Sequence, residues 1–180
     1  RHGEAEFPFR FYKEDVWEFD FHCIDWHWHP EVEFIYAEGG EVSCFVGAEQ
    51  FILSEGCGLF VNSGVLHRYE AAESVSIPNI VFSPELLGGK SGKIYQNYIA
   101  PVIESAAACV LFRPSVDWQE EILQRLLTIF RFQEREHTEL QTVASLLELW
   151  QTLYLHTAPL CGQAAGDRGR RAQLQVMMQF

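Results

Sequence analysis

The chain has 180 residues, a formal net charge of −12 and a hydrophobic fraction of 48% that includes 14 Phe and 5 Trp. This length allows one domain with a sizeable core and a small additional segment. The acidic charge argues against these residues binding the phosphate backbone of a nucleic acid by themselves. The sequence has no run of 18 apolar residues, no signal-peptide pattern and no CxxC spacing. We therefore expect a soluble cytoplasmic protein with free thiols and no membrane contact.

The first half of the chain predicts short strands separated by turns. Residues Phe7 to Tyr12 form an aromatic arm, which could be a strand of a barrel or a lid over its mouth. Residues 16–29 alternate in hydrophobicity as a strand does. Further strands are expected at residues 33–38, 41–46, 50–53, 58–61, 67–70 and 74–82. Closely spaced turns, including a hairpin turn at Gly39-Gly40, are typical of a β-sandwich or barrel.

The pattern changes after Ser83. Ser83 followed by Pro84 predicts a short helical turn, because serine caps helices and proline suits the first helical position. Residues 94–100 are then expected to be helical. Residues 109–112 are predicted to return as a last strand, so that the barrel would span roughly Phe7 to Phe112.

Two amphipathic helices are predicted after this barrel. The first is expected to begin at Asp117, with Glu120 placed as in a capping box, and the second at Thr138. Both carry apolar faces that are wider than one barrel surface can cover. We therefore predict a homodimer through the helices of residues 117–157, which a charged substitution such as Leu146→Glu would weaken if that position faces the partner.

The composition changes again near the end of the chain. Residues 159–169 are rich in Gly and Ala, and a new helical pattern with basic residues begins at Arg170 and stops in mid-pattern at Phe180. We interpret the chain as a piece of a longer protein. The predicted organisation is a barrel over residues 1–115, a helical hairpin over residues 116–157, a linker over residues 158–169 and the start of a further domain over residues 170–180.

The candidate site residues come mainly from the segment at residues 26–33. His27, His29 and Glu33 share one face of a strand if the extended path survives the proline between them, and a barrel could bring His67 back to them. Imidazole and carboxylate together suit Zn, Ni, Fe or Mn, so one divalent metal is a candidate cofactor. The same four residues could instead form a metal-free pocket that hydrogen-bonds an organic ligand, and both alternatives remain open.

Other residues near these histidines have a structural interpretation. Trp26 and Trp28 have the opposite strand parity, which favours packing against an outer layer over stacking on a ligand. The five cysteines are interpreted as structural thiols.

The spacing of these residues resembles a known family. His27-x-His29-xxx-Glu33-xxxxxx-Gly40 resembles the first cupin motif at every ligand position, and Gly56-xxxxx-Asn62-Ser63-Gly64-xx-His67 resembles the second. Two positions differ, since Asn62 stands at the proline position of the motif and Ala71 at its usual asparagine. Within the cupins, residues 26–33, 56–68 and 84–87 resemble the ligand-sensing domain of AraC-type transcription regulators, and the similarity covers about Phe7 to Phe180.

The resemblance implies a mainly β fold, with a cupin double-stranded β-helix (jelly-roll) barrel followed by an α-helical hairpin. It implies that the barrel binds a small-molecule effector, of which sugars are common in the family, in a pocket lined by His27, His29, Glu33 and His67. The same four residues would be the metal ligands. It also implies dimerisation through the hairpin and DNA binding through a missing C-terminal pair of helix-turn-helix motifs, not through this fragment.

A metal-dependent cupin enzyme, such as a dioxygenase or a sugar isomerase, would share these four residues. The helical hairpin, the linker and the interrupted third helix favour the regulator, because a small enzyme does not need them. We therefore expect the effector-sensing and dimerisation part of an AraC-type regulator, with no catalytic residues. In this interpretation the effector shifts the arm at residues 7–12 or the helical hairpin between two arrangements.

Overall fold

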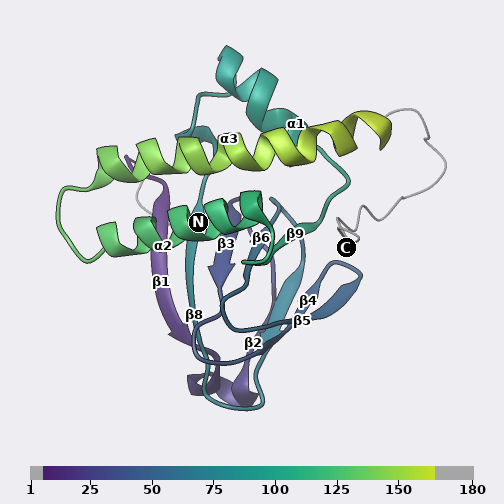
Figure 1. The fold of residues 1–180 in the computed structure, drawn as a ribbon, viewed down its shortest axis with the longest axis vertical. Coiled ribbons are helices and arrows are strands. Elements are labelled where there is room, and N and C mark those ends of the chain that lie inside the picture. Colours follow the sequence, from purple (N-terminus) through teal and green to yellow (C-terminus); the bar gives the residue numbers. More distant parts are fainter. Residues whose placement is uncertain (1–5, 165–180) are drawn as a thin grey trace.

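Two facing antiparallel sheets make up the barrel in the computed structural model, which describes residues 6–164 and the side chains of residues 6–157. The five-stranded sheet has the order β1-β8-β3-β6-β9, and the four-stranded sheet has the order β2-β7-β4-β5 (Figure 1). The strands are β1 (Phe9–Asp15), β2 (Cys23–His27), β3 (Val32–Tyr36), β4 (Val42–Val46), β5 (Glu49–Leu53), β6 (Gly58–Val61), β7 (His67–Glu70), β8 (Ser76–Phe82) and β9 (Cys109–Phe112). The predicted cupin-like sandwich is confirmed.

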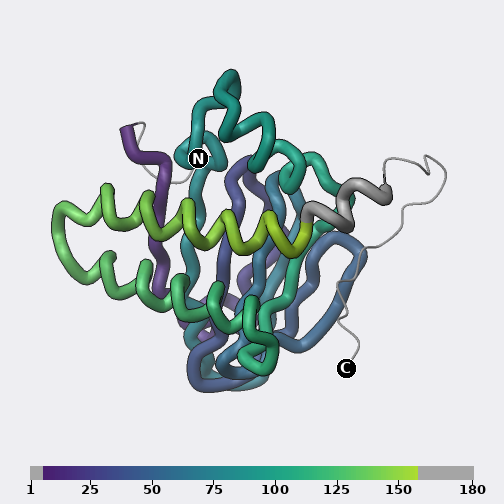
Figure 2. Tube along the Cα trace, turned by 45° about the horizontal axis from the view of Figure 1, so that its top comes forward, coloured from purple at the N-terminus to yellow at the C-terminus, as the bar shows by residue number. Residues whose placement is uncertain are grey.

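The helices lie on the outer side of the five-stranded sheet. Short helical turns occur at η1 (Val16–Glu18), η2 (Asp20–His22) and η3 (Pro84–Leu86). An insert between β8 and β9 contains η4 (Tyr95–Ile99) and α1 (Ala100–Ile103). The long helices are α2 (Asp117–Phe132) and α3 (Glu139–Ala164). Helices α2 and α3 run side by side as a hairpin across the sheet (Figures 1 and 2). Within the described part of the chain, no helix combines the length and hydrophobicity that crossing a bilayer requires.

An apolar core fixes the hairpin to the sheet. Successive strand residues point to opposite faces, so Phe34 points outward from β3 toward the helices while its neighbours point between the sheets. The Phe34 ring lies 5.0 Å from that of Phe60 and 6.1 Å from that of Phe82, measured between centroids. Burying one such side chain stabilises a protein by about 1.5–3 kcal/mol. The same cluster includes Ile122, Leu126, Ile129, Leu146, Leu149 and Leu153 of the two helices. The hairpin and the barrel therefore share one core.

The aromatic arm is a strand of the barrel rather than a lid. Residues 9–15 form β1, which pairs with β8 along its whole length from Phe9↔Phe82 to Asp15↔Ser76. The prediction of a continuous strand over residues 16–29 was wrong, because residues 16–22 form two short helical turns instead. The Asp15 carboxylate caps the first turn by accepting from Trp17 N, and Phe21 and His22 adopt positive φ values of 58° and 54°. Residues 17–22 are all exposed, so the alternation there reflects neither burial of one face nor sheet pairing.

Two local predictions from turn and capping signals were also wrong. Gly39-Gly40 does not close a hairpin, because β3 belongs to the five-stranded sheet and β4 to the other sheet. The turn carries the chain between the two sheets, with Gly39 at φ +82°. Helix α2 begins without the predicted capping box, since its N-cap residue is Val116 and no side chain caps it.

Asn62 connects the barrel to the helical insert. It follows β6 directly, and its side-chain amide donates to the carbonyls of Val102 (3.1 Å), Ile103 (3.3 Å) and Ala107 (3.1 Å). Its carbonyl oxygen accepts from the backbone N–H of Ser63 at 2.8 Å. A proline at this position, as in the cupin pattern, would have no such amide. The departure from the motif therefore has a structural explanation.

The end of α3 differs from the predicted domain organisation. The helix continues to Ala164 and therefore includes residues 158–164 of the predicted linker. Residues 165–180, which contain the rest of that linker and the predicted third helix, lie outside the described residues. The four cysteines with described side chains, Cys23, Cys44, Cys57 and Cys109, are free thiols as predicted.

The hydrogen bonds that the Asn62 amide donates should contribute measurably to the free energy of unfolding. Asn62 is 4% exposed, so replacing it with alanine removes donors from buried carbonyls. We expect Asn62→Ala to destabilise the protein by about 1–3 kcal/mol, measured by urea unfolding. Asn97→Ala makes the same chemical change at an exposed position of η4 and should have little effect. Equal unfolding midpoints for the two variants would contradict this role.

Candidate metal and ligand site

Four predicted site residues converge between the two sheets. His27 ends β2 and pairs directly with His67 at the start of β7, while Glu33 faces them from β3 of the opposite sheet. One ligand atom from each of His27, His29, Glu33 and His67 lies within 4.8 Å of the other three. His29, Glu33 and His67 are buried, and His27 is partly exposed. Pairing between distant strands thus assembles the cluster.

His29 reaches the cluster although its segment is not extended. Strand β2 ends at His27 and β3 begins at Val32, so the path predicted across Pro30 is interrupted. A turn at residues 62–64 holds the connecting segment in place instead. Gly64 N–H donates to the His29 carbonyl at 2.9 Å, and the Ser63 hydroxyl donates to the Pro30 carbonyl at 2.7 Å. His29 is therefore positioned by hydrogen bonds to its backbone segment and not by the alternation of side chains along a strand.

The three imidazoles are oriented in the same way. Nδ1 of His27 lies 2.8 Å from the Asp25 carbonyl, Nδ1 of His29 lies 3.1 Å from the Glu31 carbonyl, and Nδ1 of His67 lies 2.8 Å from the Val65 carbonyl. A carbonyl oxygen only accepts, so each Nδ1 must carry a proton and donate it. In a neutral ring, Nε2 is then left with a lone pair. Backbone carbonyls commonly fix metal-binding histidines in this tautomer.

The Nε2 atoms of two of these rings meet on one carboxylate oxygen. Oε2 of Glu33 lies 3.1 Å from Nε2 of His29 and 3.1 Å from Nε2 of His67. Two neutral rings would direct lone pairs at an anionic oxygen, which is repulsive. The arrangement is therefore stable only when positive charge lies among these atoms, either as protons on the imidazoles or as a metal cation.

The ionisation of the metal-free cluster follows from this geometry. Burial by itself would raise the pKa of Glu33, but the hydrogen bonds with His29 and His67 outweigh burial and lower it to about 2. Burial acts to lower the pKa of His29, yet the hydrogen bond and charge of Glu33 raise it overall. Burial dominates at His27 and lowers its pKa. Protons and a metal cation therefore compete for the same nitrogen atoms.

The donor set fits a divalent metal. Zinc binds imidazole nitrogen and carboxylate oxygen at about 2.0–2.2 Å, which separates neighbouring ligand atoms by roughly 3–3.5 Å. The four atoms lie within 4.8 Å of one another, so a movement of less than about 1 Å would close them around an ion. Three neutral imidazoles and one carboxylate would leave a divalent ion with one net positive charge. Such a set suits the metals expected from the sequence, Zn, Ni, Fe or Mn.

Tyr69 is a polar residue at the site that sequence reasoning missed. It follows His67 by two positions on β7, points into the same interior and is 1% exposed. Its hydroxyl has no hydrogen-bond partner among the described residues. Burial raises its pKa well above the usual value, and the charge of Glu33 adds to the rise, so the phenol stays protonated. An unpaired buried hydroxyl costs about 1–3 kcal/mol. Its strand parity with His67 could have revealed it.

The interpretation of the two tryptophans is corrected by the structure. Trp26 is 45% exposed and Trp28 is 65% exposed, so neither packs under an outer layer. The helices cover the five-stranded sheet and leave the face of the four-stranded sheet that carries Trp26 uncovered. The Trp26 ring contacts only the edge of Phe45 among the described rings, with centroids 6.1 Å apart.

The cluster should give the metal-free protein a characteristic stability profile. The pKa of Glu33 falls from 4.5 to about 2 on folding. The contribution of Glu33 to the free energy of unfolding is therefore present above pH 4.5 and is lost as the pH falls toward 2. The pKa of His29 rises from 6.5, so its contribution is present below pH 6.5 and is lost at higher pH. In the presence of chelator, the melting temperature of the wild type should therefore be highest between pH 4.5 and pH 6.5.

Glu33→Gln tests this profile, because glutamine has the same shape without the charge. The variant should lose the decrease in stability toward pH 2 that comes from Glu33 and the decrease above pH 6.5 that comes from His29, and should keep only the acidic decrease caused by the burial of His27. Glu73→Gln removes one carboxylate at an exposed position and should retain them. Parallel pH profiles for the wild type and Glu33→Gln would show that the cluster is not coupled as its geometry indicates.

The chain is similar to a known family of proteins. Residues 16–150 match the family described as AraC-like ligand binding domain. A Bacillus subtilis (strain 168) protein described as uncharacterized HTH-type transcriptional regulator YdeC is 26% identical over 158 residues, which cover 86% of this chain and 54% of that protein. The chain therefore spans about half the length of this relative.

Solved structures with partial similarity include two bacterial proteins. An RmlC-like cupin from Shewanella frigidimarina NCIMB 400 has a TM-score of 0.38 and 20% identity, over 42% of this chain and 66% of that chain. Protein NMB1881 from Neisseria meningitidis has a TM-score of 0.37 and 20% identity, over 42% of this chain and 76% of that chain. The family match covers β2 to β9, helix α2 and the first part of α3, and the chain belongs to the AraC-like ligand binding domain family.

Proposed function

We propose that this chain is the effector-sensing and dimerisation part of an AraC-type transcription regulator, and that His27, His29, Glu33 and His67 hold a divalent metal to which the effector binds. The family match supports the regulator. One observation supports the proposed metal site. Nε2 of His29 and of His67 converge on one Glu33 oxygen, while backbone carbonyls accept hydrogen bonds from the Nδ1 atoms of the same rings. A bound metal would supply a positive charge that attracts an oxygen atom of the effector.

The residues around the cluster have distinct roles in this proposal. Glu33 provides the negative charge that offsets the metal, and the carbonyls of Asp25, Glu31 and Val65 keep the imidazoles oriented for binding. His27 is the most exposed ligand, so the effector would approach beside it. The free thiols of this protein agree with function in a reducing cytoplasm.

The turn after β6 supplies a path from the cluster to the helices. Ser63 and Gly64 hold the segment that carries His29, while Asn62 in the same turn holds the insert through Val102. The insert contacts α3, where Trp150 Nε1 donates to the Tyr98 carbonyl at 3.0 Å. A ligand that displaces His29 would thereby change the forces on α3. This effect requires that the ligand bind the two arrangements with different affinities.

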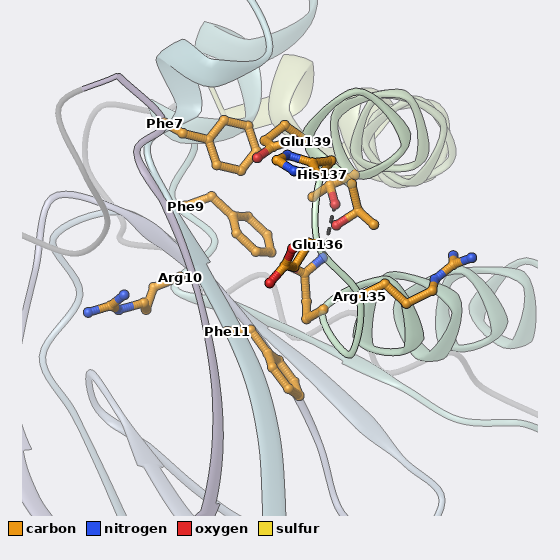
Figure 3. Close-up of a pocket in the computed structure, with 11 residues that line it drawn as sticks. Phe7, Phe9, Arg10, Phe11, Arg135, Glu136, His137 and Glu139 are labelled. Carbon is orange, nitrogen blue, oxygen red and sulfur yellow. Dashed lines mark hydrogen bonds between the residues drawn. The ribbon is translucent and has the colours of Figure 1, made fainter.

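A second contact between the barrel and the hairpin involves β1. The Phe11 ring lies 5.2 Å from that of Phe130 in α2. Beside this contact, a groove of about 530 Å³ separates the start of β1 from the turn between α2 and α3, with Phe7, Phe9, Glu136 and Glu139 around it (Figure 3). The proposed effector response could therefore reach the hairpin through β1 as well as through the insert.

The exposed side of α3 is the proposed dimer surface. Leu140, Leu147 and Leu155 are 82%, 39% and 60% exposed, and they follow one another along the helix. Leu146 is fully buried against the barrel, so it does not face a partner, and the Leu146→Glu test suggested by the sequence would disrupt the core instead. An amphipathic helix that retains exposed leucines is typical of an interface between two copies.

Sedimentation tests the dimer directly. We expect a dimeric mass at micromolar concentration for the wild type, and weaker association by at least about tenfold for Leu147→Glu, because burying an unpaired charge in an apolar interface is unfavourable. Ile52→Glu introduces the same charge on the four-stranded sheet, at a position that is 51% exposed, and should leave the mass unchanged. A monomeric wild type would contradict the proposal.

DNA binding is proposed for the longer protein and not for this fragment. The chain has a net charge of −12 and spans about half of a relative described as an HTH-type regulator. An acidic fragment lacks the positive charge that binding to phosphates requires. Gel-shift assays with this fragment should therefore detect no salt-resistant binding to a specific duplex.

A cupin enzyme is the second candidate function, because the same four side chains form the donor set that metal-dependent catalysis requires. This alternative predicts oxygen consumption or sugar isomerisation by the metal-loaded fragment without any DNA-binding partner. The regulator predicts neither reaction. Assaying the loaded fragment for both reactions separates the two functions.

Metal content provides the test of the cluster itself. Protein purified without chelator or a nickel column should carry about one metal ion per chain, and a His27→Ala/His67→Ala variant should carry less than about a tenth of that amount. His22→Ala/His156→Ala removes two exposed histidines outside the cluster and should keep the metal. Added metal should raise the melting temperature of the wild type and of the control only.

A further inference from the structure

The geometry points to Tyr69 as a further ligand-binding residue: we propose that its hydroxyl donates a hydrogen bond to an oxygen of a small organic acid held at the cluster of His27, His29, Glu33 and His67. This inference rests on the proposed function, since the acid would bind at the metal. It goes beyond that function by naming the chemical class of the ligand and the residue that recognises it.

Tyr69 lies directly beside two of the metal-binding histidines. Its ring centroid is 5.5 Å from that of His67 and 6.4 Å from that of His27. Its neighbours across the sheet are Ile24 on β2 and Cys44 on β4, neither of which can accept a strong hydrogen bond through its side chain. The tyrosine ring therefore lies among Ile24 and Cys44 of the neighbouring strands and the imidazoles of the cluster, and its hydroxyl is buried.

The fold gains nothing from this hydroxyl. The Tyr69 oxygen is buried and has no hydrogen-bond partner among the described residues, although nearly all buried polar groups in proteins are paired. Phenylalanine would fill the same space without burying an unpaired polar atom. A hydroxyl that is unfavourable in the protein alone is explained by a partner that arrives when ligand binds.

The charge of the cluster indicates what that partner is. A divalent ion held by three neutral imidazoles and Glu33 keeps one net positive charge, which favours an anionic oxygen as a further ligand. A neutral phenol donates more strongly to an anionic acceptor than to a neutral one. A carboxylate satisfies both requirements, because one oxygen can bind the metal while the other accepts from Tyr69.

Tyr69→Phe in the cobalt-loaded protein tests the inference, with acetate as the probe and the visible absorption of cobalt as the readout. We expect the variant to load cobalt normally and to bind acetate at least about tenfold more weakly than the wild type, which is the usual effect of removing a hydrogen bond to a charged group. The metal-free variant should melt at the same temperature as the wild type or higher. Tyr36→Phe, at the end of β3 distant from Glu33, should leave acetate binding unchanged.

Three results would overturn the inference, and they separate it from the proposed function. Unchanged acetate affinity in Tyr69→Phe, together with a lower melting temperature, would mean that the hydroxyl pairs within the protein. A wild-type cobalt spectrum that acetate does not change would exclude this class of ligand while leaving the metal site intact. A wild type that takes up no cobalt would reject the metal site, and this inference would fall with it.

Discussion

One carboxylate oxygen shared by two imidazoles is the constraint on which the site depends. Oε2 of Glu33 lies 3.1 Å from Nε2 of both His29 and His67 in a buried setting. The backbone carbonyls that fix the Nδ1 protons of these rings leave the cluster in need of positive charge. Protonation supplies that charge at acidic pH, and the divalent metal that we propose would supply it at neutral pH, so the stability of the site would depend on both pH and metal.

The rest of the fold serves to hold this contact while connecting it to the helices. Glu33 points inward from β3, and its neighbour Phe34 points outward into the core shared with α2 and α3. Asn62 and Ser63 join the segment around His29 to the insert at residues 95–103. Each of these connections leads from the cluster to the helical hairpin within a few hydrogen bonds or side-chain contacts. The proposed sensor function would require such proximity between the ligand site and the helices that respond.

Much of the barrel could be predicted because its strands follow simple local patterns. The bounds predicted for residues 58–61, 67–70 and 109–112 coincide with β6, β7 and β9, and the spacing of the histidines and Glu33 identified four residues that the structure brings together. The failures arose where local pattern and tertiary structure differ. Residues 16–22 alternate but form two short helical turns, of which only the first is capped by a side chain. Gly39-Gly40 joins two sheets, which no local signal distinguishes from a hairpin.

The missed features depend on contacts between distant parts of the chain. The role of Asn62 requires the carbonyls of residues 102–107, and the isolation of the Tyr69 hydroxyl requires knowledge of its neighbours on β2 and β4. The exposure of Trp26 and Trp28 follows from the position of the helices on the other sheet (Figure 1), which no local sequence pattern indicates.

Anomalous diffraction from crystals of protein purified without chelator tests the central claim most directly. The account predicts a peak among Nε2 of His27, His29 and His67 and the Glu33 carboxylate, at about 2.0–2.2 Å from each ligand atom. Crystals at neutral pH that show no anomalous peak, with the Glu33 oxygen still within hydrogen-bonding distance of both imidazoles, would contradict it.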